Sequence, residues 1–477
     1  MNINISKASR NPEELPKIYL AKSTKDLQKA AFSKTELEYI KKQFDEKKQP
    51  VILNSFPKWT YIIWIETEKE NHIVKEKIRR AAGSLYSTIK ENKHQEIIIS
   101  DLSNNAEFAL AFTEGLALSH YQFIKYYSNP EKKKNYLGNI YLQSTLIDDE
   151  QISELNILID SVFKTKDLVN EPVSFLNAEK LSSEIEKLGE EAGFDVEVFN
   201  KKKIESLKMN GLLTVNKGSI DPPTFTILTY KPKGAINKKP FVLVGKGVVY
   251  DTGGMNIKTG NYLDTMKSDM AGAAAVAGTM YAVAKSRIPV YIIGLIPATD
   301  NRLNGNAYVP DDIIKMHSGT TVEVRNTDAE GRLILADALS YAKKYNPELV
   351  IDLATLTGSA HAAIGDLGIV AMSNVKDDQF EQLKVSGNNV YERIVEFPLW
   401  EEYDEMLKSD IADLKNIGGH EAGAITAAKF LEHFTDYPWI HMDIAGSAFL
   451  GKQDNYRGVG STAVGVRLLF DFFNSQL

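Results

Sequence analysis

The feature that most constrains the fold is a regular alternation of short apolar runs and longer helix-like segments after residue 170. Short runs rich in Val and Ile predict strands, and the longer segments between them predict helices. The predicted strands are FVLVG, PVYIIGLIPA, TTVEVRN, PELVIDLATL and WIHMDIAG, and the predicted helices cover 264–286, 332–345 and 422–435. This alternation is typical of an α/β domain with a mixed, mostly parallel sheet covered by helices.

The first 150 residues predict a smaller α/β unit, because VILNSF, YIIWIE and QEIIIS resemble strands and 74–92 and 106–127 resemble helices. A further helix over about 149–170 ends before Pro172, which disfavours helical backbone at its own and the preceding position. At 477 residues the chain is too long for one core. We therefore predict an N-terminal α/β domain over 1–150, a linking helix over 151–170 and a larger domain over 171–477.

Composition excludes several classes of protein. The net charge is −7 and no extended basic stripe is present, so nucleic acid is a disfavoured partner. The chain has no cysteine, which excludes disulfides, thiolate zinc sites and cysteine nucleophiles. The N-terminus lacks the apolar core of a signal peptide, and no run reaches the roughly 18 apolar residues of a membrane span. We expect a cytoplasmic protein.

Charged side chains gather in three segments near the predicted strand ends, where ligands of such sheets bind. Asp328 and Glu330 are two positions apart, so an extended segment would direct both carboxylates to one face. Asp269 precedes a run of alanine and glycine that would let its helix approach the sheet closely. In chain order the three segments carry Lys246, Asp251 and Lys258, then Asp269, then Asp328, Glu330 and Arg332.

Four clustered carboxylates require cations, because like charges at close range force protons onto the acids. Two divalent ions would balance the four charges if Lys246 binds as a neutral amine, and such ligands suit zinc, manganese or magnesium. Lys258 and Arg332 would then face the substrate. Each segment alone is commonly a solvated turn or a helix cap. The conjunction of all three predicts a two-metal site that can activate water.

Rival motifs do not fit the sequence. The stretch Gly245-Lys246-Gly247 lacks the upstream glycine and the following Ser or Thr of a phosphate-binding loop. The third glycine of a dinucleotide fingerprint would fall on Tyr250. His420-Glu421 lacks the second histidine of a zinc protease helix, since Ala424 occupies that position.

The charged segments closely resemble the leucyl aminopeptidase (cytosol aminopeptidase) family. NTDAEGRL, residues 326–333, is similar to the signature octapeptide of that family. GKGVVYDTGG, MKSDMAGAAAV, GNAYVPDDI, DLATLTGSA and AGAITAAKFL resemble its other blocks in order and spacing. The resemblance covers about residues 165–475, whereas before that only AFTEGLALSHYQF is similar, within a domain that resembles a macro domain. Residues 299–303 depart from the pattern, and we expect this to alter a loop at the mouth of the site without touching a ligand.

The resemblance implies a role for each candidate residue. Asp251 and Glu330 would bridge two metal ions, Lys246 and Asp269 would complete one ion, and Asp328 would complete the other. Lys258 and Arg332 would be catalytic, with Lys258 stabilising the gem-diolate and Arg332 holding a bicarbonate ion as general base. The bicarbonate would also be held by Ala329, Gly331 and Leu356. The substrate would be contacted by Lys258, Met266, Asp269 and Thr355.

The reaction that the resemblance implies is removal of the N-terminal residue, leucine or another neutral residue, from a peptide with a free N-terminus. A hydroxide held between the two ions would attack the scissile carbonyl. The family usually forms homohexamers. Two alternatives stay open, since carboxylate-rich two-metal sites also serve phosphoesterases, and some members of the family also bind DNA.

Overall fold

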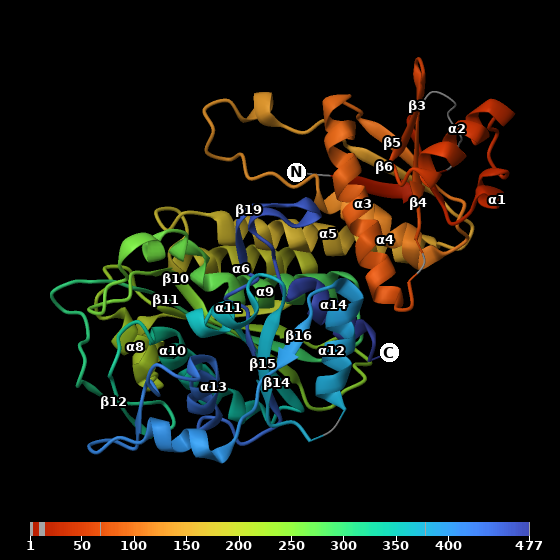
Figure 1. Ribbon diagram of the computed structural model, residues 1–477. Helices are drawn as coiled ribbons and strands as arrows, with labels where there is room; N and C mark the ends of the chain where they lie inside the picture. Colours follow the sequence, from red (N-terminus) through yellow and green to blue (C-terminus); the bar gives the residue numbers. More distant parts are fainter. Residues whose placement is uncertain (1–2, 9–14, 67, 377, 477) are drawn as a thin grey trace. The chain divides into compact units, whose positions relative to one another are not determined.

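The computed structural model describes residues 3–8, 15–66, 68–376 and 378–476, and it divides into two compact units (Figure 1). The first unit comprises Met1–Phe163 with Lys452–Gly458, and the second comprises Lys164–Gly451 with Val459–Leu477. Helix α5 (Asp149–Asn170) begins in the first unit and ends in the second. Both units are α/β, which confirms the predicted fold class.

The first unit contains a six-stranded sheet in the order β1-β6-β5-β2-β4-β3. Its strands pair in parallel except for the edge strand β3, which is antiparallel to β4. The strands are β1 (Asn4–Lys7), β2 (Lys17–Ala21), β3 (Val51–Ser55), β4 (Lys58–Trp64), β5 (Glu96–Asp101) and β6 (Asn139–Gln143). The helices are α1 (Thr24–Leu27), α2 (Lys34–Asp45), α3 (Asn71–Glu91) and α4 (Ala106–Leu118), of which α3 and α4 pack against each other.

Helix α4 ends nine residues before the predicted end at 127, and the prediction was wrong in this respect. The carbonyl of His120 accepts a hydrogen bond from the side chain of Asn135 at 2.9 Å. The side chain of Gln122 also accepts the backbone N–H of Asn135 at 2.8 Å. Both bonds come from Asn135, which lies outside the predicted helix, so hydrophobic periodicity could not reveal where the helix stops.

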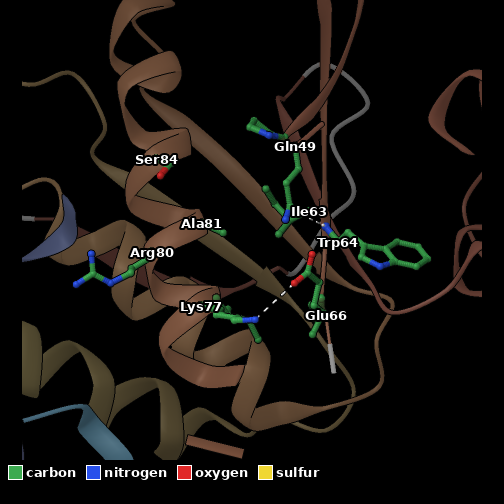
Figure 2. A pocket seen from close by; sticks show the side chains of 11 residues that line it. Gln49, Ile63, Trp64, Glu66, Lys77, Arg80, Ala81 and Ser84 are labelled. Atoms are coloured by element: carbon green, nitrogen blue, oxygen red, sulfur yellow. Dashed lines mark hydrogen bonds and ion pairs between the residues drawn. The ribbon is translucent and has the colours of Figure 1, made fainter. Parts of the chain in front are cut away.

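A cavity of about 310 Å³ lies between β4 and α3 in the first unit (Figure 2). Its lining combines apolar side chains such as Ile63 and Ile78 with charged groups at the rim. The ammonium of Lys77 pairs with the carboxylates of Glu66, at 3.6 Å, and Glu68. The guanidinium of Arg80 pairs with Glu76 and Asp454. Both rim cations are therefore already paired with acids of the chain.

The second unit contains a nine-stranded mixed sheet in the order β16-β15-β18-β14-β9-β11-β8-β7, with β10 paired to β11. Its centre, β18-β14-β9-β11, is parallel, and β15, β8 and β7 join by antiparallel pairs. The strands are β7 (Asp195–Phe199), β8 (Thr224–Tyr230), β9 (Phe241–Gly245), β10 (Gly247–Asp251), β11 (Ile292–Asn301), β14 (Leu349–Ala354), β15 (Ile369–Ser373), β16 (Ile394–Glu396) and β18 (Trp439–Asp443). A small sheet of β12 (Ile313–Lys315), β13 (Thr321–Glu323) and β17 (Leu414–Lys415) accompanies it. The chain also contains a two-stranded sheet of β19 (Phe449–Asp454) and β20 (Gly458–Ser461).

Helices cover both faces of the large sheet because alternate residues of its strands point to opposite sides. Phe241 of β9 contacts the rings of Phe472 and Phe473 on one face, whereas Val242 and Val244 join the core cluster on the other. The first face carries α6 (Ala178–Ala192), α9 (Ala271–Lys285), α12 (Gln379–Val390) and α14 (Val466–Asn474) (Figure 1). The second carries α7 (Lys201–Ser206), α8 (Asn210–Asn216), α10 (Glu330–Ala342) and α13 (Gly423–Glu432).

Two local features differ from the predictions. The segment after FVLVG, which was not among the predicted strands, forms β10, and the helix predicted from 264 begins as a 3₁₀ turn at Met266–Met270 before α9. Lys246 separates β9 from β10, because its N–H donates to Leu353 of β14 and its carbonyl accepts from Ala273 of α9. Within the described residues, no helix is long and apolar enough to cross a membrane.

Candidate metal centre

The predicted site residues meet at the carboxyl ends of the parallel strands of the second unit. Lys246 follows β9, Asp251 ends β10, and Thr355 follows β14, while Asp269 lies in the turn before α9 and Glu330 begins α10. They line a cavity of about 630 Å³. The predicted residues among its lining are Lys246, Asp251, Lys258, Met266, Asp269, Asp328, Ala329, Glu330, Arg332, Thr355 and Leu356.

Glycine at two positions lets the elements of the site approach one another. A Cβ on Gly272 of α9 would lie 2.0 Å from the carbonyl oxygen of Leu353 in β14. This agrees with the expectation that small side chains bring the helix close to the sheet. Gly331 was predicted to help hold bicarbonate, but it is not among the residues that line the cavity. It faces Lys246, and a Cβ on Gly331 would lie 2.5 Å from Cε of Lys246.

The carboxylates of Asp251, Asp328 and Glu330 each offer an oxygen within 4.8 Å of the others. The expected reason for the convergence of Asp328 and Glu330 was wrong, because the segment is not extended. Asp328 lies in a turn, and Glu330 is the first residue of α10. The turn and the first helical residue bring both side chains to the cavity, a geometry that residue spacing alone does not predict.

The amine of Lys246 is completely enclosed by acceptors. Its Nζ lies 2.7 Å from Oδ1 of Asp269 and 2.9 Å from Oε1 of Glu330, and it donates to the carbonyl of Thr355 at 2.8 Å. Burial by itself would lower the pKa of Lys246, but the carboxylates of Asp269, Glu330 and Asp251 outweigh it and raise the pKa. The Lys246 ammonium therefore lies between the carboxylates of two buried acids, Asp269 and Glu330.

Lys258 pairs with the other two acids of the cluster. Its Nζ lies 2.8 Å from Oδ2 of Asp251 and 2.5 Å from Oδ1 of Asp328. Burial opposes the charged form, but the carboxylates of Asp251, Glu330 and Asp328 raise the pKa of Lys258. Its side chain is 16% exposed against 3% for Lys246, so Lys258 reaches the open part of the cavity.

The acids hold more negative charge than the two lysines can balance. Burial raises the pKa of Asp269 well above its usual range, and the carboxylates of Glu330 and Asp251 add to the shift. Burial likewise raises the pKa of Asp328 to about 7, again with neighbouring carboxylates adding to it. Oδ2 of Asp269 and Oε2 of Glu330 are buried and have no hydrogen-bond partner among the described residues. Buried carboxylate oxygens without a partner, in a cluster where three carboxylates converge, are the kind of donor that divalent cations require, so these residues fit a metal site.

Arg332 lines the cavity and is 6% exposed. Its Nη1 donates to the carbonyl of Asn416 at 2.7 Å, whereas its buried Nε has no partner among the described residues. Burial lowers the pKa of Arg332 to about 10, against the opposing charges of Glu330 and Asp443. The guanidinium is therefore a desolvated donor beside the acid cluster, which suits it to hold an anion.

Sequence reasoning missed two residues that hold the site in place. Asn301 donates to Oδ1 of Asp251 at 2.8 Å, so the departure over 299–303 does touch a predicted ligand, contrary to our expectation. The sequence could have indicated Asn301, because it is a polar residue near the carboxyl end of a predicted strand, where ligands of such sheets bind. Asp443, at the end of β18, accepts the backbone N–H of Leu356, and it had the same signal in WIHMDIAG.

Comparison with known proteins agrees with this geometry. Residues 163–470 match the catalytic domain of the cytosol aminopeptidase family, and residues 60–130 match the N-terminal domain of that family. The chain is 44% identical to a probable cytosol aminopeptidase of Chlorobium limicola over 420 residues, covering 82% of each chain. It is 37% identical to one of Aquifex aeolicus over 461 residues, covering 95% of this chain and 92% of the other.

Two solved structures share the fold along nearly the whole chain. The bottromycin maturation enzyme BotP in complex with Mn has a TM-score of 0.86 and 25% identity, covering 98% of this chain and 100% of BotP. A mutant of tomato leucine aminopeptidase has a TM-score of 0.85 and 26% identity, covering 99% of this chain and 96% of its own. The phosphoesterase and DNA-binding alternatives gain no support from these relatives. By sequence, fold and acid cluster, the chain belongs to the cytosol aminopeptidase family and is a metallo-aminopeptidase, a hydrolase of peptide bonds.

Proposed function

We propose that this chain releases N-terminal residues from peptides at a two-metal centre held by Lys246, Asp251, Asp269, Asp328 and Glu330. The observation that carries the proposal is the pair of buried carboxylate oxygens on Asp269 and Glu330 that lack partners among the described residues. Zinc or manganese suits the combination of carboxylates with one amine, and magnesium is the third candidate. Relatives named as aminopeptidases, and the Mn complex of BotP, support this assignment.

Bound divalent ions supply an activated water and polarise the scissile carbonyl. The residues of the chain do the remaining work. Lys258 reaches the open cavity, and its fixed ammonium would stabilise the negative charge that develops on the carbonyl oxygen. Asp269 and Thr355, which a hydrogen bond joins, would bind the free α-amine of the peptide. The cavity lining includes the apolar side chains of Met266 and Phe449, which favours leucine or another neutral residue at the N-terminus.

Arg332 would hold a bicarbonate ion that serves as general base, cradled by Ala329, Gly331 and Leu356. Its support is the buried Nε of the Arg332 guanidinium, which lines the cavity and has no hydrogen-bond partner among the described residues. We expect bicarbonate to stimulate the wild-type enzyme and to have no effect on Arg332→Met. The exposed Arg325 provides the control, since Arg325→Met should respond to bicarbonate as the wild type does. Equal stimulation of both variants would refute the role of Arg332.

The central experiment is a panel of aminoacyl amides assayed on chelated protein reloaded with manganese, zinc or magnesium. Leucyl and other neutral substrates should be hydrolysed best, and Asp269→Asn should lose at least about 100-fold in kcat/KM. The control is Asp264→Asn, an exposed acid five residues earlier in the chain. Activity that survives both chelation and Asp269→Asn would overturn the two-metal proposal. Faster hydrolysis of phosphate esters than of aminoacyl amides would overturn the peptidase assignment.

The family resemblance also supports a homohexamer, which light scattering on the purified chain would test. Several relatives carry the name cytosol aminopeptidase, which supports a cytoplasmic location. Cell fractionation would test it, and recovery of the protein from another fraction would contradict it.

A further inference from the structure

Asp443 joins two loops that leave neighbouring parallel strands, β14 and β18. Its carboxylate is 1% exposed. Oδ1 accepts the backbone N–H groups of Leu356, at 3.2 Å, and Ala445, at 3.1 Å, and Oδ2 accepts the hydroxyl of Thr357 at 2.7 Å. Three donors from two loops therefore converge on one buried side chain. A carboxylate that accepts several hydrogen bonds fixes its donors more tightly than a neutral acceptor would.

The loop that Asp443 holds is the one that touches the metal centre. The carbonyl of Thr355 accepts the amine of Lys246 at 2.8 Å, and the hydroxyl of Thr355 donates to Oδ1 of Asp269 at 2.8 Å. Two residues further on, Thr357 begins helix α11 (Gly358–Ile364) by accepting the N–H of Ala360 at 3.0 Å. Hydrogen bonds therefore connect Asp443, through a three-residue loop, to two predicted metal ligands.

A second buried acid of the same sheet lacks this connection. Asp352 of β14 is 0% exposed, and it accepts the ring nitrogen Nδ1 of His441 at 2.6 Å and Nε1 of Trp439 at 2.7 Å. Both partners lie within β18 and do not line the cavity. Asp352 therefore resembles Asp443 in burial and in the number of strands it joins, but it does not hold the loop.

We propose that Asp443 is a positioning residue, which fixes the loop 355–357 so that Thr355 holds Lys246 and Asp269 in the arrangement that binds metal. The inference deepens the proposed function and rests on its assignment of Lys246 and Asp269 as ligands. Residues that orient metal ligands commonly change metal affinity by 10–100-fold when removed. A small misplacement of a catalytic group can cost about 100-fold in rate.

The test compares conservative and disruptive changes at both ends of the Asp443–Thr357 hydrogen bond. Asp443→Asn keeps an oxygen for both N–H groups, and its amide can donate to the Thr357 hydroxyl, so it should stay within about 5-fold of wild type. Thr357→Ser should also retain function. Asp443→Ala and Thr357→Val remove the contact and should lose about 100-fold in kcat and about 10-fold or more in manganese affinity. The two disruptive changes are independent, so Thr357→Val tests the contact even if Asp443→Ala does not fold.

Manganese affinity is measured by titration of the chelated protein, alongside kcat on a leucyl amide and the melting temperature. Asp352→Ala is the matched control, which should lower the melting temperature but leave the manganese affinity of the folded protein unchanged. Equal manganese affinities for Thr357→Val, Thr357→Ser and Asp352→Ala would overturn the positioning role. If wild type binds manganese but hydrolyses no aminoacyl amide, the proposed function fails, whereas the ranking of affinities still decides the role of Asp443.

Discussion

The side-chain amide of Asn301 donates a 2.8 Å hydrogen bond to Oδ1 of Asp251, and the backbone N–H of Gly253 donates to the same oxygen at 2.8 Å. The same amide also donates to the carbonyl of Thr327 at 3.0 Å. Oδ2 of Asp251 faces Lys258. One oxygen is therefore fixed by the protein while the other points into the cluster.

Replacing Asn301 should weaken metal binding without unfolding the chain. Asn301→Ala removes one of the two donors that orient Asp251, so we expect manganese affinity to fall by about 10–100-fold in a titration of the chelated protein. The control is Asn304→Ala, since Asn304 is exposed and its side chain accepts only the adjacent N–H of Gly305 in the described structure. Unchanged affinity in Asn301→Ala would show that Gly253 alone suffices to orient Asp251.

Gly331→Ala should impair the enzyme through Lys246. The added Cβ would lie 2.5 Å from Cε of Lys246, and real contacts of this kind are longer, so the lysine must move away from Asp269 and Glu330. We expect a loss of at least about 10-fold in kcat/KM, measured on a leucyl amide at saturating manganese. A Cβ at Gly451 meets no atom of the described residues within 4 Å, so Gly451→Ala should behave as wild type. A fully active Gly331→Ala would mean that Lys246 has room to adjust.

Metal should stabilise the folded chain, because the acids of the cluster are brought together only in the folded state and the unfolded chain therefore offers no such site. One ion at about 100 times its dissociation constant raises the free energy of unfolding by about 2.7 kcal/mol. Denaturation with chelator and with manganese measures the difference. Glu330→Gln removes a buried carboxylate of the cluster and should reduce the stabilisation by manganese. Glu402→Gln alters an exposed acid and should leave that stabilisation unchanged. Equal stabilisation of the two variants would place the stabilising ion elsewhere.

His120 should make the first unit sensitive to acid. Burial lowers the pKa of His120 from 6.5 to about 4, with a smaller contribution from Lys90. The unfolded chain therefore binds this proton more readily, so stability is present above pH 6.5 and is lost as the pH falls from 6.5 towards 4. Between pH 7 and pH 5 the loss amounts to about 2 kcal/mol.

The measurement is denaturation of wild type and His120→Gln at both pH values, followed by the fluorescence of Trp59 and Trp64 in the first unit. His120→Gln has no proton to gain, so its stability should change less with pH than that of wild type. Equal pH dependence in the two proteins would show that the ring of His120, which bonds to the hydroxyl of Tyr86 at 3.0 Å, is protonated without cost.

Much of the larger unit was predictable because its elements have strong local patterns. FVLVG coincides with β9, and WIHMDIAG contains β18, since buried parallel strands are continuous runs of apolar residues. β10 was missed because GVVYD follows directly after Lys246 and resembles an extension of the same run. The backbone contacts of Lys246 with β14 and α9, which separate β9 from β10, join residues far apart in the chain.

The sequence by itself determined the α/β class, the charged segments and, through NTDAEGRL, the family, because these are properties of local pattern and residue type. Only the tertiary structure decided that Lys246 lies between Asp269 and Glu330 while Lys258 lies between Asp251 and Asp328. It also decided that Asn301 and Asp443 hold the site, since each acts on a partner more than 40 positions away. Such contacts depend on the register of strands and the close approach of α9 to β14, which are set by the packing of the whole unit.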